Sequence, residues 1–171
     1  MKYSFFALLL TLCFAPAQTL PNSSELGVPA GQVRVFEFQT LPTSVQIYTC
    51  KANPTGAFIW TGPDPDAILM SQDKSLTVHH YKGPAWEATD GSIVLGSNAK
   101  HFRAARENSV DWLELTAKGG TQKFAKVAFI HRVDTEGGIA PDPVMHSCDA
   151  TRVGDQVRVP YSARYEFFAA K

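Results

Sequence analysis

The feature that most constrains the fold is a two-residue alternation of side chains near the end of the chain. Over residues 161–168, aromatic and small residues alternate with Ser162, Arg164 and Glu166, until Phe168 breaks the pattern. Successive side chains of a β-strand point to opposite faces, so this period indicates a strand with one buried face. A helical period of 3.6 residues occurs only weakly, over residues 100–108. The chain is therefore expected to fold as β-structure.

Further segments of the chain have the composition of short strands. They are rich in β-branched and aromatic residues, are bounded by Pro or Gly, and span residues 33–39, 44–50, 57–60, 67–70, 76–81, 92–95, 112–117, 124–133 and 156–159. About ten short strands separated by turns are typical of an antiparallel β-barrel or β-sandwich. We therefore predict an all-β fold that is more than about 40% strand, against roughly 20–25% in an average globular protein.

Composition and charge exclude several classes of protein. Apolar residues make up 44% of the chain and charged residues 19%, which argues against intrinsic disorder. The formal net charge is zero, with 16 basic and 16 acidic residues, and no run of Lys and Arg forms a basic stripe. Since binding to nucleic acid depends on neutralising phosphates, no nucleic-acid partner is expected.

The first 17 residues are typical of a signal peptide. Lys2 is followed by an apolar run over residues 5–14, and Ala15-Pro16-Ala17 has the small side chains of a cleavage site. The apolar run is shorter than the ~20 residues of a membrane-spanning helix, so no membrane span is expected. We predict cleavage after Ala17 and a secreted or periplasmic protein. A flexible lead-in over residues 18–31 and a single all-β domain over residues 32–171 would remain.

The cysteines are predicted to form one disulfide bond. Cys13 lies in the predicted signal peptide, which leaves Cys50 and Cys148 in the mature chain. Two thiols in an oxidising compartment are most simply a disulfide. No CxxC motif or closely spaced Cys and His pair indicates a metal site, and no metal or cofactor is predicted.

Residues 79–92 hold the densest group of chemically active side chains. His79 and His80 are neighbours on a predicted strand, so their side chains leave opposite faces. His80 shares its face with apolar residues, and we expect it to point into the interior while His79 points to solvent.

A buried imidazole needs a polar partner, and two charged residues could supply one. We expect His80, Glu87 and Arg132 to form one polar cluster beside Trp86. The cluster could be structural, with an Arg132–Glu87 ion pair. Alternatively it could be a site in which Arg132 binds the carboxylate of a substrate.

Five sequence motifs resemble those of the secreted family catalogued as domain of unknown function 3455. They occur in the order SVQIYTC (44–50), HYKGPAWEATDGS (80–92), DWLELTAKG (111–119), IHRVDTEGGIAP (130–141) and VPYSARYEFF (159–168). The resemblance covers residues 33–168. Three residues depart from the family's usual pattern: His131 stands where Gln is usual, Glu114 interrupts an apolar strand, and Lys82 replaces a small residue.

The resemblance implies little about function. Some members of the family carry a malate dehydrogenase label, but a nicotinamide dehydrogenase needs a phosphate-binding GxGxxG loop between a strand and a helix. This chain has no such string. It also has no GxSxG nucleophile motif, no HExxH zinc motif and no P-loop. We therefore do not expect a dehydrogenase, and we consider catalysis less well supported than binding.

Two classes of function remain open after the sequence analysis. The first is a non-catalytic binding or cell-envelope module for a small molecule or glycan, held at a surface lined by Trp60, Trp86 and Trp112. The second is a metal-dependent or acid/base hydrolase using His80, Glu87 and Asp90, with His131 as a further candidate. The candidate ligand-binding residues are His80, Trp86, Glu87, Asp90, Trp112 and Arg132.

Overall fold

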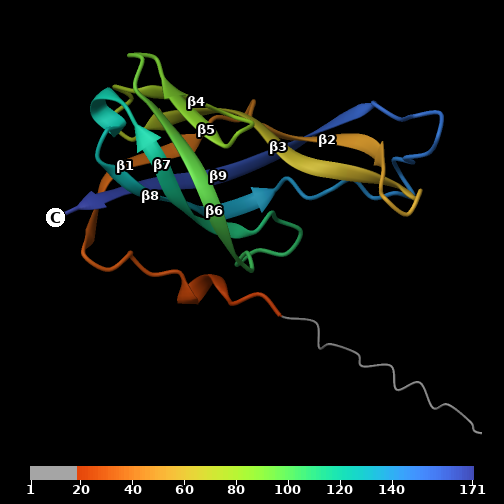
Figure 1. Cartoon of the computed structure of the whole chain (residues 1–171), viewed down its shortest axis with the longest axis horizontal. Helices are drawn as coiled ribbons and strands as arrows, with labels where there is room; N and C mark the ends of the chain where they lie inside the picture. The colour runs from red at the N-terminus through yellow and green to blue at the C-terminus, as the bar shows by residue number, and fades with distance from the viewer. Residues whose placement is uncertain (1–18) are drawn as a thin grey trace, which may run out of the picture.

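Strands make up most of the structure. The computed structural model describes residues 19–171 (Figure 1), so the predicted signal peptide, residues 1–17, and its cleavage site lie outside the described residues. The two 3-10 helices of the described part, η1 (Ser23–Glu25) and η2 (Gln122–Phe124), are not long or apolar enough to cross a membrane. At 58% strand, the structure confirms the predicted all-β fold. The strands are β1 (Gln32–Thr40), β2 (Val45–Ala52), β3 (Phe58–Ser71), β4 (Thr77–Tyr81), β5 (Ala85–Ala88), β6 (Ile93–Phe102), β7 (Trp112–Gly120), β8 (Val127–Gly137) and β9 (Gln156–Ala170).

All nine strands of the described residues belong to one antiparallel sheet, which closes on itself. In hydrogen-bonding order they run β1, β3, β2, β9, β8, β7, β6, β5 and β4, and β4 pairs back with β3. β1 and β2 each pair with both β3 and β9, at different positions along those two strands. β1 and β2 therefore share one place in the ring, and the nine strands occupy eight places. Of the two predicted architectures this is the closed one, because a sandwich needs two separate sheets.

β2, β3 and β9 extend beyond the ring as a three-stranded arm, which lies at the right of Figure 1. β3 pairs with β4 only over residues 66–70, whereas its first half pairs with β2. β9 pairs with β2 over residues 156–160 and with β8 from Tyr161 onward. The arm therefore begins where β4 and β8 no longer accompany the longer strands.

The interior of the ring is filled largely by aromatic side chains. Tyr161, Ala163, Tyr165 and Phe167 of β9 are all buried, as the alternation predicted. Phe167 packs edge-on against neighbouring rings, with ring centroids 5.2 Å from both Phe38 and Phe124. Such contacts stabilise a core beyond the burial of area alone.

Two pairs of predicted strands are single long strands in the structure. All of the predicted strand 57–60 except Ala57 belongs to β3 together with residues 67–70, and residues 156–159 and 161–168 both belong to β9. The prolines that suggested breaks lie where the pairing changes, since Pro63 is at a register shift against β2 and Pro160 ends the β2 ladder on β9. Proline is tolerated there because a missing N–H costs little outside a regular ladder.

The lead-in covers part of the outer face of the ring. Residues 25–30 and the side chains of Lys100, Phe102, Glu114 and Phe129 line a groove of about 410 Å³. In the same region two of the three departures from the family pattern meet, with 3.2 Å between His131 Nε2 and Glu114 Oε2. Lys100 Nζ lies 2.7 Å from the other oxygen of Glu114. Glu114 thus belongs to a polar group on the outer face, although His131 itself is buried.

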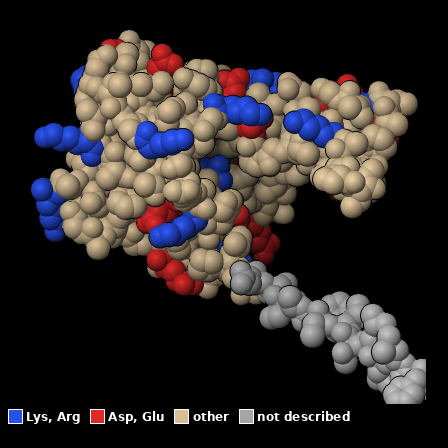
Figure 2. Space-filling model, in the orientation of Figure 1, with Lys and Arg blue, Asp and Glu red and all other residues tan. Residues whose placement is uncertain are grey.

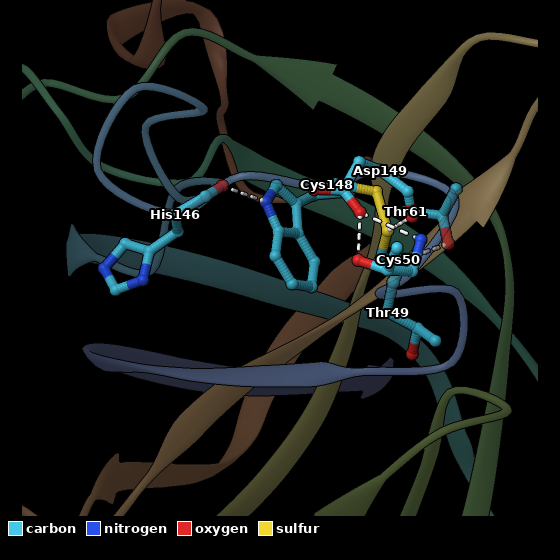
Figure 3. The surroundings of a disulfide bond; sticks show 8 residues. Thr49, Cys50, Thr61, His146, Cys148 and Asp149 are labelled. Atoms are coloured by element: carbon cyan, nitrogen blue, oxygen red, sulfur yellow. Dashed lines mark hydrogen bonds between the residues drawn. A yellow bond between two sulfur atoms is a disulfide. The ribbon is translucent and has the colours of Figure 1, made fainter.

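The predicted disulfide between Cys50 and Cys148 is present. It ties the segment after β8 to the arm, as Figure 3 shows. Next to it, the Trp60 indole N–H donates to the carbonyl of His146 at 2.8 Å. The bond therefore anchors the long connection between β8 and β9 to the arm.

Removing the disulfide is expected to cost several kcal/mol of folding free energy. The cysteines are separated by 98 residues, and the chain-entropy model assigns about 4–5 kcal/mol to a loop of this length. Chemical denaturation of the Cys50→Ser/Cys148→Ser variant measures this loss. Denaturation of the native protein with and without reductant is a second measure, and equal midpoints would contradict the prediction.

Gly96 of β6 is expected to be intolerant of a side chain. A Cβ atom at this position would lie 2.9 Å from Trp86 Cζ3 and 3.0 Å from Leu115 Cδ2. Because both neighbours are buried, Gly96→Ala should lower the free energy of unfolding by about 1–3 kcal/mol, the usual cost of overpacking. Gly27→Ala is the matched control, since no atom lies within 4 Å of its Cβ position. A similar unfolding midpoint for the two variants would contradict this account.

Candidate functional site

A cavity of about 640 Å³ opens where the arm joins the ring. Its walls come from strands β2 to β9 and from connections between them, which contribute Pro84, Val110 and Ile139. A cavity of this size is in the range that holds small organic molecules. Three of the six predicted site residues line it: His80, Trp86 and Arg132.

His80 and Trp86 form the inner part of the cavity wall. They lie directly opposite one another on β4 and β5, so both side chains leave the same face of the sheet. Their rings stack with centroids 4.3 Å apart and an interplanar angle of 2°. The ring of Tyr165 meets the His80 ring edge-on at 5.1 Å. The prediction that His80 points inward and His79 outward is confirmed.

The burial of His80 keeps its imidazole neutral. Loss of hydration lowers the pKa of His80 to about 3, although a hydrogen bond to a backbone carbonyl opposes this shift. His80 Nδ1 lies 2.9 Å from the carbonyl oxygen of Ala85, which can only accept. Nδ1 therefore carries the proton, and Nε2 remains a hydrogen-bond acceptor.

Arg132 places a positive charge in the same wall. It lies on β8 between Leu113 of β7 and Tyr165 of β9, which also line the cavity. Only 7% of the residue is exposed. Its Nε and one terminal nitrogen donate to the carbonyl oxygen of Asp111, at 3.1 and 2.8 Å. The guanidinium group also lies beside the Tyr165 hydroxyl, whose pKa it lowers through its charge and a hydrogen bond, against the effect of burial.

Two contacts between a carboxylate and a basic side chain lie at the rim of the cavity. Lys82 Nζ is 2.7 Å from Asp64 Oδ2. His101 Nδ1 is 2.9 Å from Asp111 Oδ2. All four side chains belong to lining residues. Each rim carboxylate thus has a basic partner of its own.

The position of Glu87 contradicts the predicted polar cluster. Glu87 is exposed, lies opposite His79 rather than His80, and accepts a hydrogen bond from the Tyr81 hydroxyl at 3.1 Å. The reason is the alternation of β5: once Trp86 faces inward, its neighbour must face outward. The hypothesis that Glu87 joins His80 and Arg132 is therefore wrong.

Asp90 and Trp112 also lie away from the cavity. Asp90 accepts from the backbone N–H of Ser92 in a turn and pairs with Lys123 at 2.8 Å. Trp112 is half-buried, and neither it nor Trp60 is among the residues that line the cavity. The three tryptophans therefore do not form one binding surface. Within residues 19–171, no three His, Cys, Asp or Glu side chains are grouped to hold a metal ion.

Several cavity residues are not among the sequence candidates. Tyr165 lies on the strand with the clearest alternation, so its inward direction was predictable, but its place beside a cavity was not. Tyr48 lies in the motif SVQIYTC, and its hydroxyl donates to the carbonyl of Gly138 at 2.8 Å. His101 and Asp111 come together across the connection between β6 and β7, and no sequence signal indicated that pairing.

Fold and site together define a closed antiparallel β-sheet with a cavity at one end. The chain belongs to the family described as protein of unknown function DUF3455, whose pattern matches residues 29–169. The resemblance inferred from the five motifs is thereby confirmed. No curated protein and no solved structure matches the chain.

His80 is expected to make the protein less stable in acid. Its pKa of about 3 in the folded protein lies below the usual 6.5, so between these values the unfolded chain binds a proton that the folded protein excludes. The free energy of unfolding should therefore fall as pH decreases from about 6.5 toward 3, by up to about 1.4 kcal/mol per pH unit from this residue.

Urea denaturation at several pH values measures this effect. His80→Gln should lose the contribution of one titrating histidine to the slope, whereas the control His79→Gln, at an exposed neighbour, should keep it. The prediction fails if His80→Gln and the native protein show the same slope between pH 6.5 and pH 3.5.

Proposed function

We propose that this protein is a non-catalytic binding protein for a small molecule, held in the cavity where the arm joins the ring. The observation that carries the proposal is the cavity itself, about 640 Å³ with mostly apolar walls and a few polar groups. Small-molecule sites have this composition, since apolar walls supply affinity and a few polar groups fix orientation.

Unpaired polar atoms near the cavity also support binding. The indole N–H of Trp86 and the side-chain amide of Gln46 are buried without a hydrogen-bond partner. Gln46 lies directly opposite the cavity residue Pro65, and two residues before the cavity residue Tyr48. Buried polar groups are usually paired with protein, water or a ligand, so such unpaired groups are a feature of binding sites.

The shape of the wall favours a small molecule over a glycan. Glycan sites commonly present an exposed aromatic face to a sugar ring, whereas Trp86 is 1% exposed and stacked on His80. The alternative of a hydrolase built on His80, Glu87 and Asp90 has no such support. Glu87 and Asp90 are exposed residues outside the cavity wall, and His80 is held neutral in it.

We further propose that the protein acts outside the cytoplasm, secreted or in the periplasm. The disulfide bond supports this location, because such bonds persist in oxidising compartments. The sequence of residues 1–17 supports it as well, since it is typical of a signal peptide.

Titration with a neutral fluorescent probe tests the binding function. N-phenyl-1-naphthylamine should bind with an increase in fluorescence, because the walls of the cavity shield it from water. Ala99→Trp adds a bulky side chain to the cavity wall and should weaken binding by more than about tenfold, the loss of roughly 1.4 kcal/mol of contact energy.

The same substitution outside the cavity is the control. Ala57 lies on the exposed loop of the arm and is not a lining residue, so Ala57→Trp should bind the probe as the native protein does. Equal affinity of the two variants would contradict binding in this cavity, and no binding by the native protein would contradict the proposed function.

A further inference from the structure

Arg132 is a buried cation that no carboxylate neutralises. No Asp or Glu oxygen within residues 19–171 lies within 4.0 Å of its guanidinium nitrogens, although Arg132 is only 7% exposed. Its hydrogen-bond partners are uncharged: the carbonyl of Asp111 and the hydroxyl of Tyr165. Burying a charge without an opposite charge is costly, and proteins usually provide a partner. The partner of Arg132 is therefore expected to come from outside the chain.

The carboxylates closest to the cavity are already engaged. Asp64 pairs with Lys82, and the side chain of Asp111 pairs with His101. These pairs lie at the exposed rim, where the side chains of Lys82 and His101 are 73% and 50% exposed. The wall around Arg132 consists instead of aromatic and aliphatic groups, such as Trp86, Leu113 and Tyr165. The positive charge thus faces a mostly apolar space.

The effect of this charge reaches the neighbouring side chains. Burial raises the pKa values of the Tyr48 and Tyr165 hydroxyls, and the positive charge of Arg132 opposes the rise at both. The same charge adds to the burial that lowers the pKa of His80. Three groups lining one cavity therefore experience Arg132 as an uncompensated cation, which would also attract an anion entering the cavity.

We propose that the cavity binds a monocarboxylate with an apolar body, and that Arg132 binds its carboxylate group. The inference rests on the proposed binding function and names its ligand class. One buried guanidinium matches one negative charge, and its planar donors suit the two oxygens of a carboxylate. The apolar walls then contact the body of the ligand, away from the rim pairs. On the face shown in Figure 2, basic and acidic side chains are mixed. The selectivity for an acid is therefore assigned to the cavity and not to a basic outer surface.

Matched pairs of acids and amides test this assignment. Benzoic, 2-naphthoic and decanoic acid are each compared with their primary amide by calorimetric titration at pH 7.5. The amides have nearly the same size but no charge, so the native protein should bind at least one acid about tenfold or more tightly than its amide. This is the preference expected of a hydrogen bond to a charged group.

Substitution of Arg132 locates the preference. Arg132→Met should bind an acid and its amide with equal affinity, and Arg132→Lys, which keeps the charge, should retain part of the preference. Arg158→Met is the control, because Arg158 is an exposed surface arginine and its loss should leave the preference unchanged. If Arg132→Met does not fold, the role of Arg132 is tested by whether Arg132→Lys reduces the preference for acids over amides that the native protein shows.

The possible failures are distinguishable. Equal affinity of the native protein for acids and amides would overturn the carboxylate assignment and leave the binding function in place. A preference that survives in Arg132→Met would overturn the role of Arg132. If the fluorescent probe binds and none of the six compounds does, the ligand class fails and the binding function stands. If neither the probe nor any of the six compounds binds, both fail.

Discussion

The pairing of β4 with β3 is the constraint on which the rest of the structure depends. It closes the sheet, so that no long strand edge within the ring is left to be covered, and it fixes the size of the interior. A ring with eight places is just wide enough for side chains to fill. The Phe38, Phe124 and Phe167 rings fill it at one end. A cavity can therefore form only toward the other end, where β2, β3 and β9 continue without β4 and β8.

Two buried residues that can carry a charge, His80 and Arg132, lie at that end of the ring. His80 and Arg132 would each be unfavourable in a filled aromatic core, because both are largely removed from water. His80 is accommodated as a neutral ring with one hydrogen bond to the backbone. Arg132 retains its charge beside a carbonyl group. The buried charge of Arg132 destabilises the fold, and it lies in the cavity wall, where a ligand can contact it. Binding of an anion there would offset this cost.

Much of the fold could be predicted from the sequence, because it depends on local patterns. The alternation over residues 161–168 identified the inward residues of β9, and the two cysteines outside the predicted signal peptide identified the disulfide. The same rule could have excluded Glu87, since it adjoins Trp86 on β5 and the two cannot share a face. The rim pairs could not be predicted. His101 and Asp111 meet only through the course of the connection after β6, which no periodicity describes.

The order of the strands has a consequence for how the protein reaches its folded state. β9 is the last strand of the chain, yet it is the neighbour of β1, β2 and β8. β1 and β2 therefore have β3 as a neighbour on one side but remain unpaired on the other side until β9 has been synthesised. Contacts between such distant segments make folding slow. The sheet consequently closes more slowly than one built from local hairpins alone.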